Sequence, residues 1–368
     1  MITVERLAKK FSMRGSSLTA VDDVSFEVGN GEICVFIGPS GCGKTTTLKM
    51  INRLIAPTSG RVLIDGQDTR QLDTVSLRRS IGYVIQQGGL FPNMTVEENI
   101  CIVPKLLGWD KARYRKRAHD LMEMVSLDPG QFLSRYPREL SGGQQQRIGV
   151  IRALAGDPPL MLMDEPFGAI DPIIRASIQD EFLKLQKEVK KTILFVSHDL
   201  DEAVKMGDKI AIFQAGKLMQ IDTPARILSY PANDFVRKFV GRDSEFRRLS
   251  LISASEVVRR DVQPARASSD VGSMSGFFGG SALIPVVDDD NRLVGSVNTN
   301  TIVERRGRMM EHIAEDFPFA LETDDLRYVS TIMMKLKVDV VPCAAKDGSY
   351  LGVIDRLSIS ARLNEVPV

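Results

Sequence analysis

Residues 38–45 read GPSGCGKT, a glycine-rich loop that ends in a lysine and a threonine. The loop follows the apolar run ICVFI and precedes TTLKMINRLI, and this order of strand, loop and helix is the context of a phosphate-binding loop. Backbone N–H groups in such a loop surround phosphate oxygens, and the helix start adds partial positive charge. Lys44 adds a full charge, and Thr45 is expected to hold Mg²⁺. The alternative is an ordinary glycine turn before a helix.

Two neighbouring acids end a second apolar run, LMLMDE, at residues 160–165. Asp164 is expected to bind magnesium through water, and Glu165 to polarise the water that attacks the γ-phosphate of a nucleotide. Without the phosphate loop, a strand ending in solvated acids would be the better interpretation. With that loop in the same chain, the pair indicates phosphoryl-transfer chemistry.

Two further polar residues follow apolar runs. His198 follows ILFVS, where a neutral imidazole could contact the γ-phosphate and orient Glu165 or the water. Gln86 follows IGYVI, where its amide could reach magnesium or water. Each residue alone is more typical of an ordinary structural position. The two indicate a nucleotide site only because of their order along the chain together with the other motifs.

A second phosphate-compatible helix start is predicted at residues 140–147, LSGGQQQR. A phosphate loop grips ATP from one side and leaves the other flank of the γ-phosphate open. Ser141 and the N–H groups of Gly142 and Gly143 could close that flank. The residues themselves do not say whether the ATP belongs to the same chain or to another.

The set of motifs, in this order, resembles the ATP-binding cassette (ABC) ATPases over roughly residues 1–240. The resemblance implies an α/β P-loop NTPase fold with a RecA-like core and a helical subdomain, and ATP and Mg²⁺ as cofactors. It identifies LSGGQ as the family signature, GAID at 168–171 as the D-loop and Gln86 as the Q-loop. The implied catalytic residues are Lys44, Glu165 and His198, and the implied metal ligands are Thr45, Gln86 and Asp164. The implied ATP-binding residues are Phe11 (stacked on adenine), Gly38, Pro39, Ser40, Gly41, Cys42, Gly43, Lys44, Thr45, Thr46, Gln86, Ser141, Gly142, Gly143, Gln144, Asp171 and His198.

The resemblance also implies that the site is shared between two copies. In the family, Ser141 of one chain would meet the nucleotide held by Lys44 of another. The chain is therefore expected to form a head-to-tail homodimer with two ATPs at the interface.

Length and composition predict two domains in a cytoplasmic protein. At 368 residues the chain exceeds what one core usually supports, and 43% hydrophobic with 26% charged residues is ordinary for a globular protein. The first eleven residues, MITVERLAKKF, lack the apolar stretch of a secretory peptide. Four scattered cysteines favour reduced thiols, and a net charge of +1 gives no reason to expect nucleic acid as a partner. We expect an ATPase domain over 1–242, with a helical insertion over about 92–158.

The remaining residues contain a weak repeat, since IPVVDDDNRLVGSVN at 284–298 matches VPCAAKDGSYLGVID at 341–355 with an offset of 57. Two copies, about 250–308 and 309–368, are expected to pack together. The second copy has a helix-spaced apolar stripe, whereas the same offset in the first falls on serines and glycines, so that helix is doubtful there. The stripe consists of Leu326, Val329, Ile332, Met333 and Leu336.

The repeat resembles a tandem pair of cystathionine-β-synthase (CBS) modules, an α+β domain over 250–368. In the related importers such modules are linked to regulation by ionic strength or by an adenine cyclic dinucleotide, so a regulatory nucleotide is a possible partner. The Thr and Asp that often hold a ribose would fall at Asn298 and Thr301, and at Asp355 and Ser358. This departure puts ordinary mononucleotide binding in doubt.

Within the family, LRRSIGYVIQQGGLFPNMTVEENI resembles the ATPase subunits of osmoprotectant importers. That implies ATP-driven uptake of quaternary amines such as glycine betaine, carnitine or choline. It also implies a location at the cytoplasmic face of the membrane, bound to integral permease subunits and served indirectly by an extracytoplasmic substrate-binding protein.

Three alternatives stay open at this point. The main one is an ABC importer ATPase for another small solute, an amino acid or a sugar. A non-transport ABC protein of translation or DNA repair usually has two cassettes or a long coiled coil, and no sustained heptads are present. A ligand sensor with an idle ATPase conflicts with the presence of Glu165.

Overall fold

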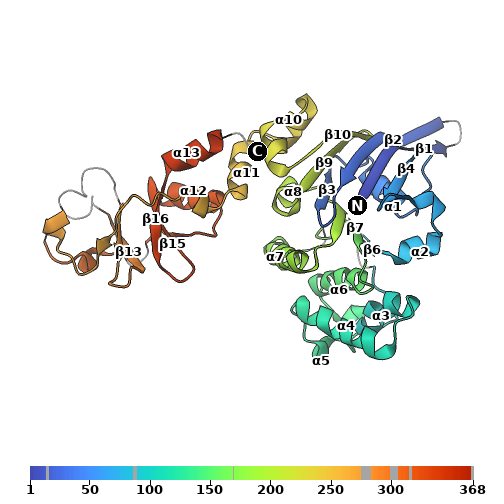
Figure 1. The fold of residues 1–368 in the computed structure, drawn as a ribbon, viewed down its shortest axis with the longest axis horizontal. Helices are drawn as coiled ribbons and strands as arrows, with labels where there is room; N and C mark the ends of the chain where they lie inside the picture. Colours follow the sequence, from blue (N-terminus) through green and yellow to red (C-terminus); the bar gives the residue numbers. More distant parts are fainter. Residues whose placement is uncertain are drawn as a thin grey trace. The chain divides into compact units, whose positions relative to one another are not determined.

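The computed structural model describes residues 1–13, 16–85, 89–168, 170–274, 283–298, 306–314 and 317–365. The chain forms two compact units, Met1–Val240 and Gly241–Val368, and Figure 1 follows them in colour from blue to red. Among the described residues, no helix combines the length and the apolar character needed to span a bilayer.

A six-stranded sheet with the order β10-β9-β3-β8-β7-β6 forms the centre of the first unit. All its strands are parallel except β10, which pairs antiparallel with β9 at one edge. Every residue of β3, β7 and β8 is buried, as expected for strands covered on both faces. The predicted α/β class is confirmed. The strands are β3 (Ile33–Ile37), β6 (Ile81–Val84), β7 (Leu160–Asp164), β8 (Thr192–Val196), β9 (Lys209–Gln214) and β10 (Lys217–Asp222).

A second, antiparallel sheet with the order β2-β1-β4-β5 was not predicted from the sequence. Helix α1 (Lys44–Ile51) contributes Leu48, Met50 and Ile51 to a core that also contains side chains from both sheets. The pairing of β1 with β2 shifts register three times, so the strands lack a clean alternation of apolar and polar residues. The strands are β1 (Ile2–Met13), β2 (Ser16–Val28), β4 (Ser59–Ile64) and β5 (Gln67–Asp68).

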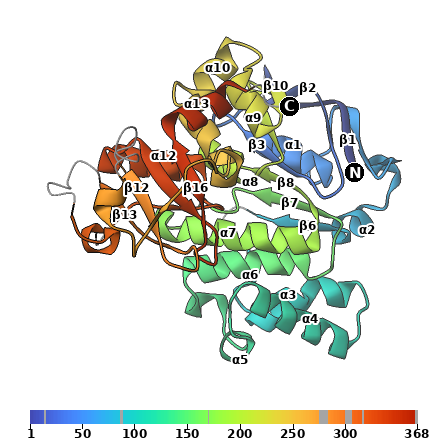
Figure 2. The same ribbon diagram turned by 60° about the vertical axis from the view of Figure 1, so that its left-hand side comes forward.

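Only helices and loops occupy residues 92–158, all of which are described. Helices α3, α4, α5 and α6 are capped at Thr95, Asp110, Asp128 and Ser141. They gather below the central sheet in Figure 1, and α6 lies alongside α7 in Figure 2. Their bounds are α3 (Val96–Leu106), α4 (Lys111–Met124), α5 (Pro129–Phe132) and α6 (Gly142–Leu154), with a 3₁₀ turn η2 (Pro137–Glu139).

The remaining helices of the first unit connect its strands or follow the last of them. The predicted hairpin at Ala215 and Gly216 is confirmed, and both residues have positive φ angles, 47° and 83°. The helices are α2 (Thr74–Arg79), α7 (Pro172–Val189), α8 (Leu200–Met206), α9 (Pro224–Ser229), α10 (Asp234–Val240) and the 3₁₀ turn η1 (Thr69–Gln71).

The second unit contains two three-stranded sheets of the same topology, β11-β12-β13 and β14-β15-β16. In each, a short strand runs parallel to the middle strand, which pairs antiparallel with the third. The middle and third strands of the two sheets differ by the same 57 residues as the sequence repeat. The strands are β11 (Ala265–Arg266), β12 (Leu283–Val287), β13 (Leu293–Asn298), β14 (Ala320–Leu321), β15 (Val340–Ala344) and β16 (Tyr350–Asp355).

Helix α12 (Leu326–Leu336) is present as predicted and buries Leu326, Val329 and Met333. Leu336 was wrongly placed in the apolar stripe, since 48% of its surface is exposed. The next residue, Lys337, has a left-handed φ of 55° that ends the helix. In the first copy, the residues at the same offset are described only as far as Met274, and Val271–Met274 form a 3₁₀ turn. The other helices are α11 (Ser244–Arg248), α13 (Arg356–Asn364) and the 3₁₀ turns η3 (Leu249–Leu251), η4 (Ala254–Glu256), η5 (Val271–Met274) and η7 (Met309–His312).

Candidate active site

The glycine loop between β3 and α1 has a backbone that side chains would disrupt. Gly38, Gly41 and Gly43 have φ angles of 144°, 75° and 105°. A Cβ at Gly38 would lie 2.3 Å from the carbonyl oxygen of Phe213, and one at Gly43 would lie 2.4 Å from that of Ala20. A Cβ at Gly41 would meet no atom within 4 Å, so that glycine is there for its conformation alone. The loop therefore has the glycine-dependent geometry of a phosphate cradle.

The side chain of Lys44 folds back over this loop. It is 8% exposed, and its Nζ donates hydrogen bonds to the carbonyl oxygens of Gly38 at 2.7 Å and Pro39 at 3.1 Å. The ammonium group therefore lies inside the curve of the loop, close to where loop N–H groups can bind phosphate oxygens. Of the other loop residues named above, Pro39, Ser40 and Gly41 are exposed, Cys42 is buried and Thr46 is half-buried.

Thr45 and Asp164 come together across the edge of the sheet. The hydroxyl of Thr45 donates to Oδ1 of Asp164 at 2.8 Å, and Asp164 is 4% exposed. Burial raises the pKa of Asp164, while the hydrogen bond from Thr45 acts in the opposite direction. The two oxygens suit Mg²⁺, which is commonly held by one or two protein groups together with substrate phosphates. Gln86, the third predicted ligand, lies outside the described residues, among which no cluster of three His, Cys, Asp or Glu residues could hold a metal.

Glu165 and His198 face each other beside this pair. Glu165 has a left-handed φ of 50°, and its N–H donates to the carbonyl oxygen of Val196 at 3.1 Å. Its Oε2 lies 3.8 Å from Nδ1 of His198, which follows β8 and has a 63% exposed side chain. A left-handed residue other than glycine is uncommon and is often found at functional sites. The bend turns this carboxylate toward the loop that carries the histidine.

The signature segment begins helix α6 and is fixed by its own hydrogen bonds. The N–H of Ser141 donates to Oε1 of Gln144 at 2.9 Å, and the N–H of Gln144 donates to the hydroxyl of Ser141 at 3.3 Å. Ser141 and Gly142 are exposed, and a Cβ at Gly142 would meet no atom within 4 Å. A Cβ at Gly143 would lie 3.7 Å from Ile178. The segment thus presents an open helix start.

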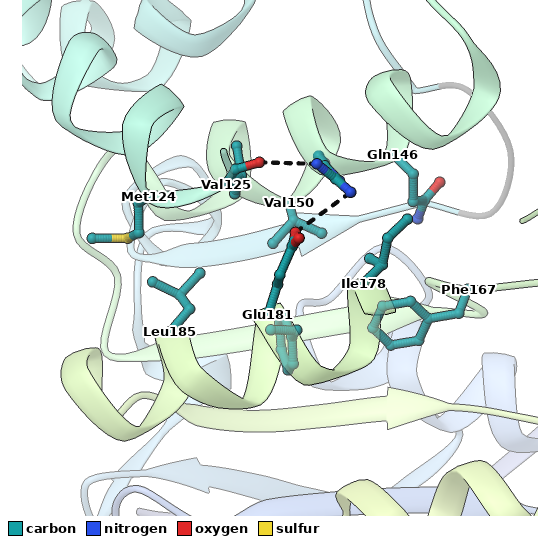
Figure 3. A pocket seen from close by; sticks show the side chains of 10 residues that line it. Met124, Val125, Gln146, Val150, Phe167, Ile178, Glu181 and Leu185 are labelled. Atoms are coloured by element: carbon teal, nitrogen blue, oxygen red, sulfur yellow. Dashed lines mark hydrogen bonds and ion pairs between the residues drawn. The ribbon is translucent and has the colours of Figure 1, made fainter. Parts of the chain in front are cut away.

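Helix α6 is tied to α7 and to the end of α4 by one arginine. Arg147 donates to the carbonyl oxygen of Val125 at 3.2 Å and forms an ion pair with Glu181 at 3.5 Å (Figure 3). Beside this pair lies a cavity of about 20 Å³, lined mainly by apolar side chains such as Val150 and Phe167. Because α7 connects β7 to β8, the ion pair ties the signature helix to the part of the unit that contains the central sheet.

The structure therefore brings together Lys44, Thr45, Asp164, Glu165 and His198, which follow or end the neighbouring strands β3, β7 and β8. Among the described residues, no hydrogen bond joins Ser141–Gln144 to the loop at 38–45.

Phe11 and Asp171, which were also predicted to bind ATP, lie on β1 and directly before α7. Phe11 is on β1, opposite Leu18, with Nζ of Lys9 5.0 Å from its ring centroid. Asp171 is exposed before α7, and its carbonyl oxygen accepts from the N–H of Arg175 at 2.9 Å.

A buried polar cluster beside His198 was missed by the sequence analysis. It consists of Gln179, Ser197 and Glu202, each less than 9% exposed. The one available signal is the sequence DLDEAV, in which Glu202 directly precedes the apolar residues Ala203 and Val204 on α8.

This arrangement defines a P-loop ATPase of the ABC class. The family model described as "ABC transporter" matches residues 21–168. The osmoprotectant import ATP-binding protein OsmV of Salmonella typhimurium is 51% identical, over 97% of this chain and 94% of its own length. The choline transport ATP-binding protein OpuBA of Bacillus subtilis is 45% identical, over 98% of this chain and 95% of its own length.

A solved structure supports the same conclusion. The ATP-binding cassette MJ0796, dimeric and bound to ADP and Pi, has 35% identity and a TM-score of 0.55, over 61% of this chain and 98% of its own. The chain belongs to the ABC transporter ATPases, and it is an ATP-binding, ATP-hydrolysing member of that family.

Proposed function

We propose that this chain is the ATPase subunit of an importer for quaternary-amine osmoprotectants such as glycine betaine, carnitine or choline. The main observation in support of ATPase activity is the arrangement of five side chains at one edge of the sheet. They are Lys44, Thr45, Asp164, Glu165 and His198. The solute class is supported by the similarity to OsmV and OpuBA, whose alignments cover 97% and 98% of this chain and so include the second unit. The chain would act at the cytoplasmic face of the membrane, on permease subunits.

Each residue at the sheet edge has a proposed part in hydrolysis. The loop N–H groups and Lys44 would bind the β- and γ-phosphates. Thr45 and Asp164 would hold Mg²⁺, a cation that would supply charge stabilisation for the phosphates. Glu165 orients and polarises the attacking water, and His198 positions Glu165 and the γ-phosphate. Phe11 stacks on adenine, and Gln86 and Asp171 complete the nucleotide pocket.

Two chains would form each complete site. Ser141, Gly142 and Gly143 present an open helix start, and no hydrogen bond joins it to the phosphate loop within the described part of the chain. We place Ser141 of one copy against the nucleotide on Lys44 of its partner. The dimeric state of the related cassette MJ0796 supports this arrangement.

Mixing two single-cysteine variants tests the shared site. Ser40→Cys and Ser141→Cys chains, mixed and oxidised with ATP, should form covalent dimers, whereas Ser40→Cys with Ser134→Cys should not. Ser134 is an exposed residue of the same helical segment, and the four native cysteines are all buried. Equal crosslinking at both positions would contradict the shared site.

The second unit is proposed to be a tandem CBS module that regulates the ATPase. Its repeated sheets support that assignment. The carboxylate of Asp355, near the expected ribose position, already accepts hydrogen bonds from the N–H of Ser358 at 2.7 Å and from Arg259 at 2.6 Å. Thr301 lies outside the described residues. Ionic strength or a cyclic dinucleotide is therefore a better candidate signal than a mononucleotide.

Uptake assays test the solute class. Vesicles that contain the permease and this chain should accumulate betaine, carnitine or choline with internal ATP, and Lys44→Ala should abolish accumulation. Uptake of an amino acid or a sugar instead would favour the alternative importer.

Removal of residues 241–368 tests the regulatory role of the second unit. It should preserve ATP hydrolysis and abolish the response to internal salt or dinucleotide. An unchanged response would contradict the regulatory role.

A further inference from the structure

The loop that carries His198 rests on a buried polar cluster. Ser197 is 2%, Gln179 6% and Glu202 7% exposed. The hydroxyl of Ser197 donates to Oε2 of Glu202, and Nε2 of Gln179 donates to Oε1 of Glu202 at 2.9 Å. Because the three residues lie in the loop, in α7 and in α8, Glu202 connects three segments. We call these residues the Glu202 cluster.

The cluster holds both neighbours of His198. The hydroxyl of Ser197 accepts from the N–H of Asp199 at 3.0 Å, and the N–H of Ser197 donates to the carbonyl oxygen of Phe36 on β3 at 2.9 Å. His198 therefore stands between two residues whose backbones are tied to the cluster and to the central sheet. Loss of the Glu202 carboxylate would remove the acceptor of the Ser197 hydroxyl and free this loop to shift.

Arg175 extends the connection to the D-loop. Its Nη2 donates to the carbonyl oxygen of Ile170 at 3.0 Å, and its Nη1 lies 4.0 Å from Oδ2 of Asp199. Helix α7 thus holds the D-loop residue next to Asp171 and the residue after His198 at the same time. The D-loop and the loop that carries His198 are therefore both held by α7.

A carboxylate at this depth is costly for stability. Burial raises the pKa of Glu202, and hydrogen bonds from Ser197 and Gln179 only partly oppose this effect. An apolar side chain of similar size often serves a protein interior as well as or better than a buried charge. The packing of the core does not require an acid at position 202. A role in positioning the loop that carries His198 explains why a glutamate is found there.

We propose that Glu202 is a positioning residue for hydrolysis: through Ser197 and Gln179 it fixes the loop that places His198 opposite Glu165. The present separation of His198 Nδ1 and Glu165 Oε2 is 3.8 Å. The inference rests on the proposed roles of these two residues. Glu202 itself is not proposed to contact the nucleotide or the attacking water.

Steady-state phosphate release by the full-length chain tests the proposal. Glu202→Ala should lower kcat about tenfold to hundredfold, the scale expected for an ångström-sized misplacement, with KM for ATP changed by less than about twofold. Glu202→Gln, which can still accept from Gln179 and bond to Ser197, should recover most of kcat. Equal losses in both variants would indicate a charge effect and overturn the positioning role.

A matched control removes a different link between the same helices. Asp180 on α7 pairs with Lys205 on α8 at 2.7 Å, and its side chain is 58% exposed. Asp180→Asn should leave kcat unchanged. If Glu202→Ala also kept the parental kcat at a temperature well below its unfolding transition, the proposal would be wrong and the cluster would serve stability alone.

A double-mutant cycle distinguishes failure of the role of Glu202 from failure of the proposed active site. If Glu202 acts through His198, Glu202→Ala should cost little more in a His198→Ala background, because the two changes disable one element. Additive losses would overturn the inference and leave the role of His198 intact. Normal hydrolysis by His198→Ala and Glu165→Gln would overturn the proposed site itself.

Discussion

Asp164 in the ATPase unit and Asp355 in the second unit both end a strand, and both are nearly buried, at 4% and 9% exposure. Asp164 has a neutral hydroxyl as its partner, and burial raises its pKa. Burial would also raise the pKa of Asp355, but hydrogen bonds from Ser358 and the Arg259 guanidinium outweigh it and hold that pKa low. A buried acid whose hydrogen-bond partner is a neutral hydroxyl fits a proposed Mg²⁺ ligand, whereas an acid already paired with a guanidinium stabilises the fold.

The largest expected effect separates these two acids by activity. Asp164→Asn should lower ATP hydrolysis about a hundredfold or more, because the amide removes the charge that the proposed metal site requires. Asp355→Asn should leave hydrolysis close to that of the parent chain. Phosphate release by both variants measures the contrast, and comparable losses in the two would show that the acids do not differ in this way.

Two glycines extend the comparison to the backbone. Gly43→Ala would place a Cβ 2.4 Å from the Ala20 carbonyl oxygen, and Gly352→Ala would place one 2.1 Å from that of Arg259, both at positive φ. Each change should cost about 1–3 kcal/mol in strain. Gly43→Ala should also abolish binding of a fluorescent ATP analogue, whereas Gly352→Ala should only lower the unfolding temperature. Normal nucleotide binding by Gly43→Ala would contradict the phosphate-loop assignment.

The paired acid is expected to matter for stability. Asp355→Asn should lower the free energy of unfolding by about 1–2 kcal/mol, because hydrogen bonds to a charged group are lost. Asp339→Asn is the matched control, since it breaks an ion pair with Arg356 whose two side chains are 75% and 61% exposed. That change should have little effect. Urea unfolding measures both, and equal effects would indicate that burial of the pair is unimportant.

The smallest effect is a difference in pH dependence. The lowered pKa of Asp355 gives a stabilising contribution that is present above the unfolded value of about 3.9 and is lost as pH falls through the folded value. The raised pKa of Asp164 gives a destabilising contribution, complete above the folded value and absent below about pH 3.9.

Unfolding free energies across this range measure both contributions. Near neutral pH, Asp164→Asn should be more stable than the parent chain, and its advantage should vanish toward about pH 4. The deficit of Asp355→Asn should persist to about pH 4 and disappear only below it. A deficit for Asp164→Asn at neutral pH would contradict the comparison.

Residues in short motifs at strand ends could be predicted from the sequence, because parallel strands bring their carboxyl ends to one edge. Thr45 and Asp164 are 119 positions apart and still meet at 2.8 Å. The antiparallel sheet was missed, because residues such as Arg6 and Asp23, with φ of 46° and 52°, interrupt the two-residue period of its strands. Irregularities of this kind are visible only in the folded backbone.

The Glu202 cluster was missed for a different reason. Gln179 and Glu202 are 23 positions apart on separate helices, and no motif spacing marks their contact. Glu202 is buried because of the way α7 and α8 pack together. The sequence around Glu202 alone does not reveal this packing. The pairing of Asp355 with Arg259, 96 positions away, is of the same kind.

The reciprocal hydrogen bonds at Ser141 and Gln144 hold the start of α6 in shape before any second molecule arrives. Two chains that meet across ATP would therefore dock as nearly rigid surfaces, and little conformational freedom would be lost at this segment on association. The lifetime of such a pair would then depend mainly on the nucleotide between the surfaces, so that cleavage of ATP could time its separation.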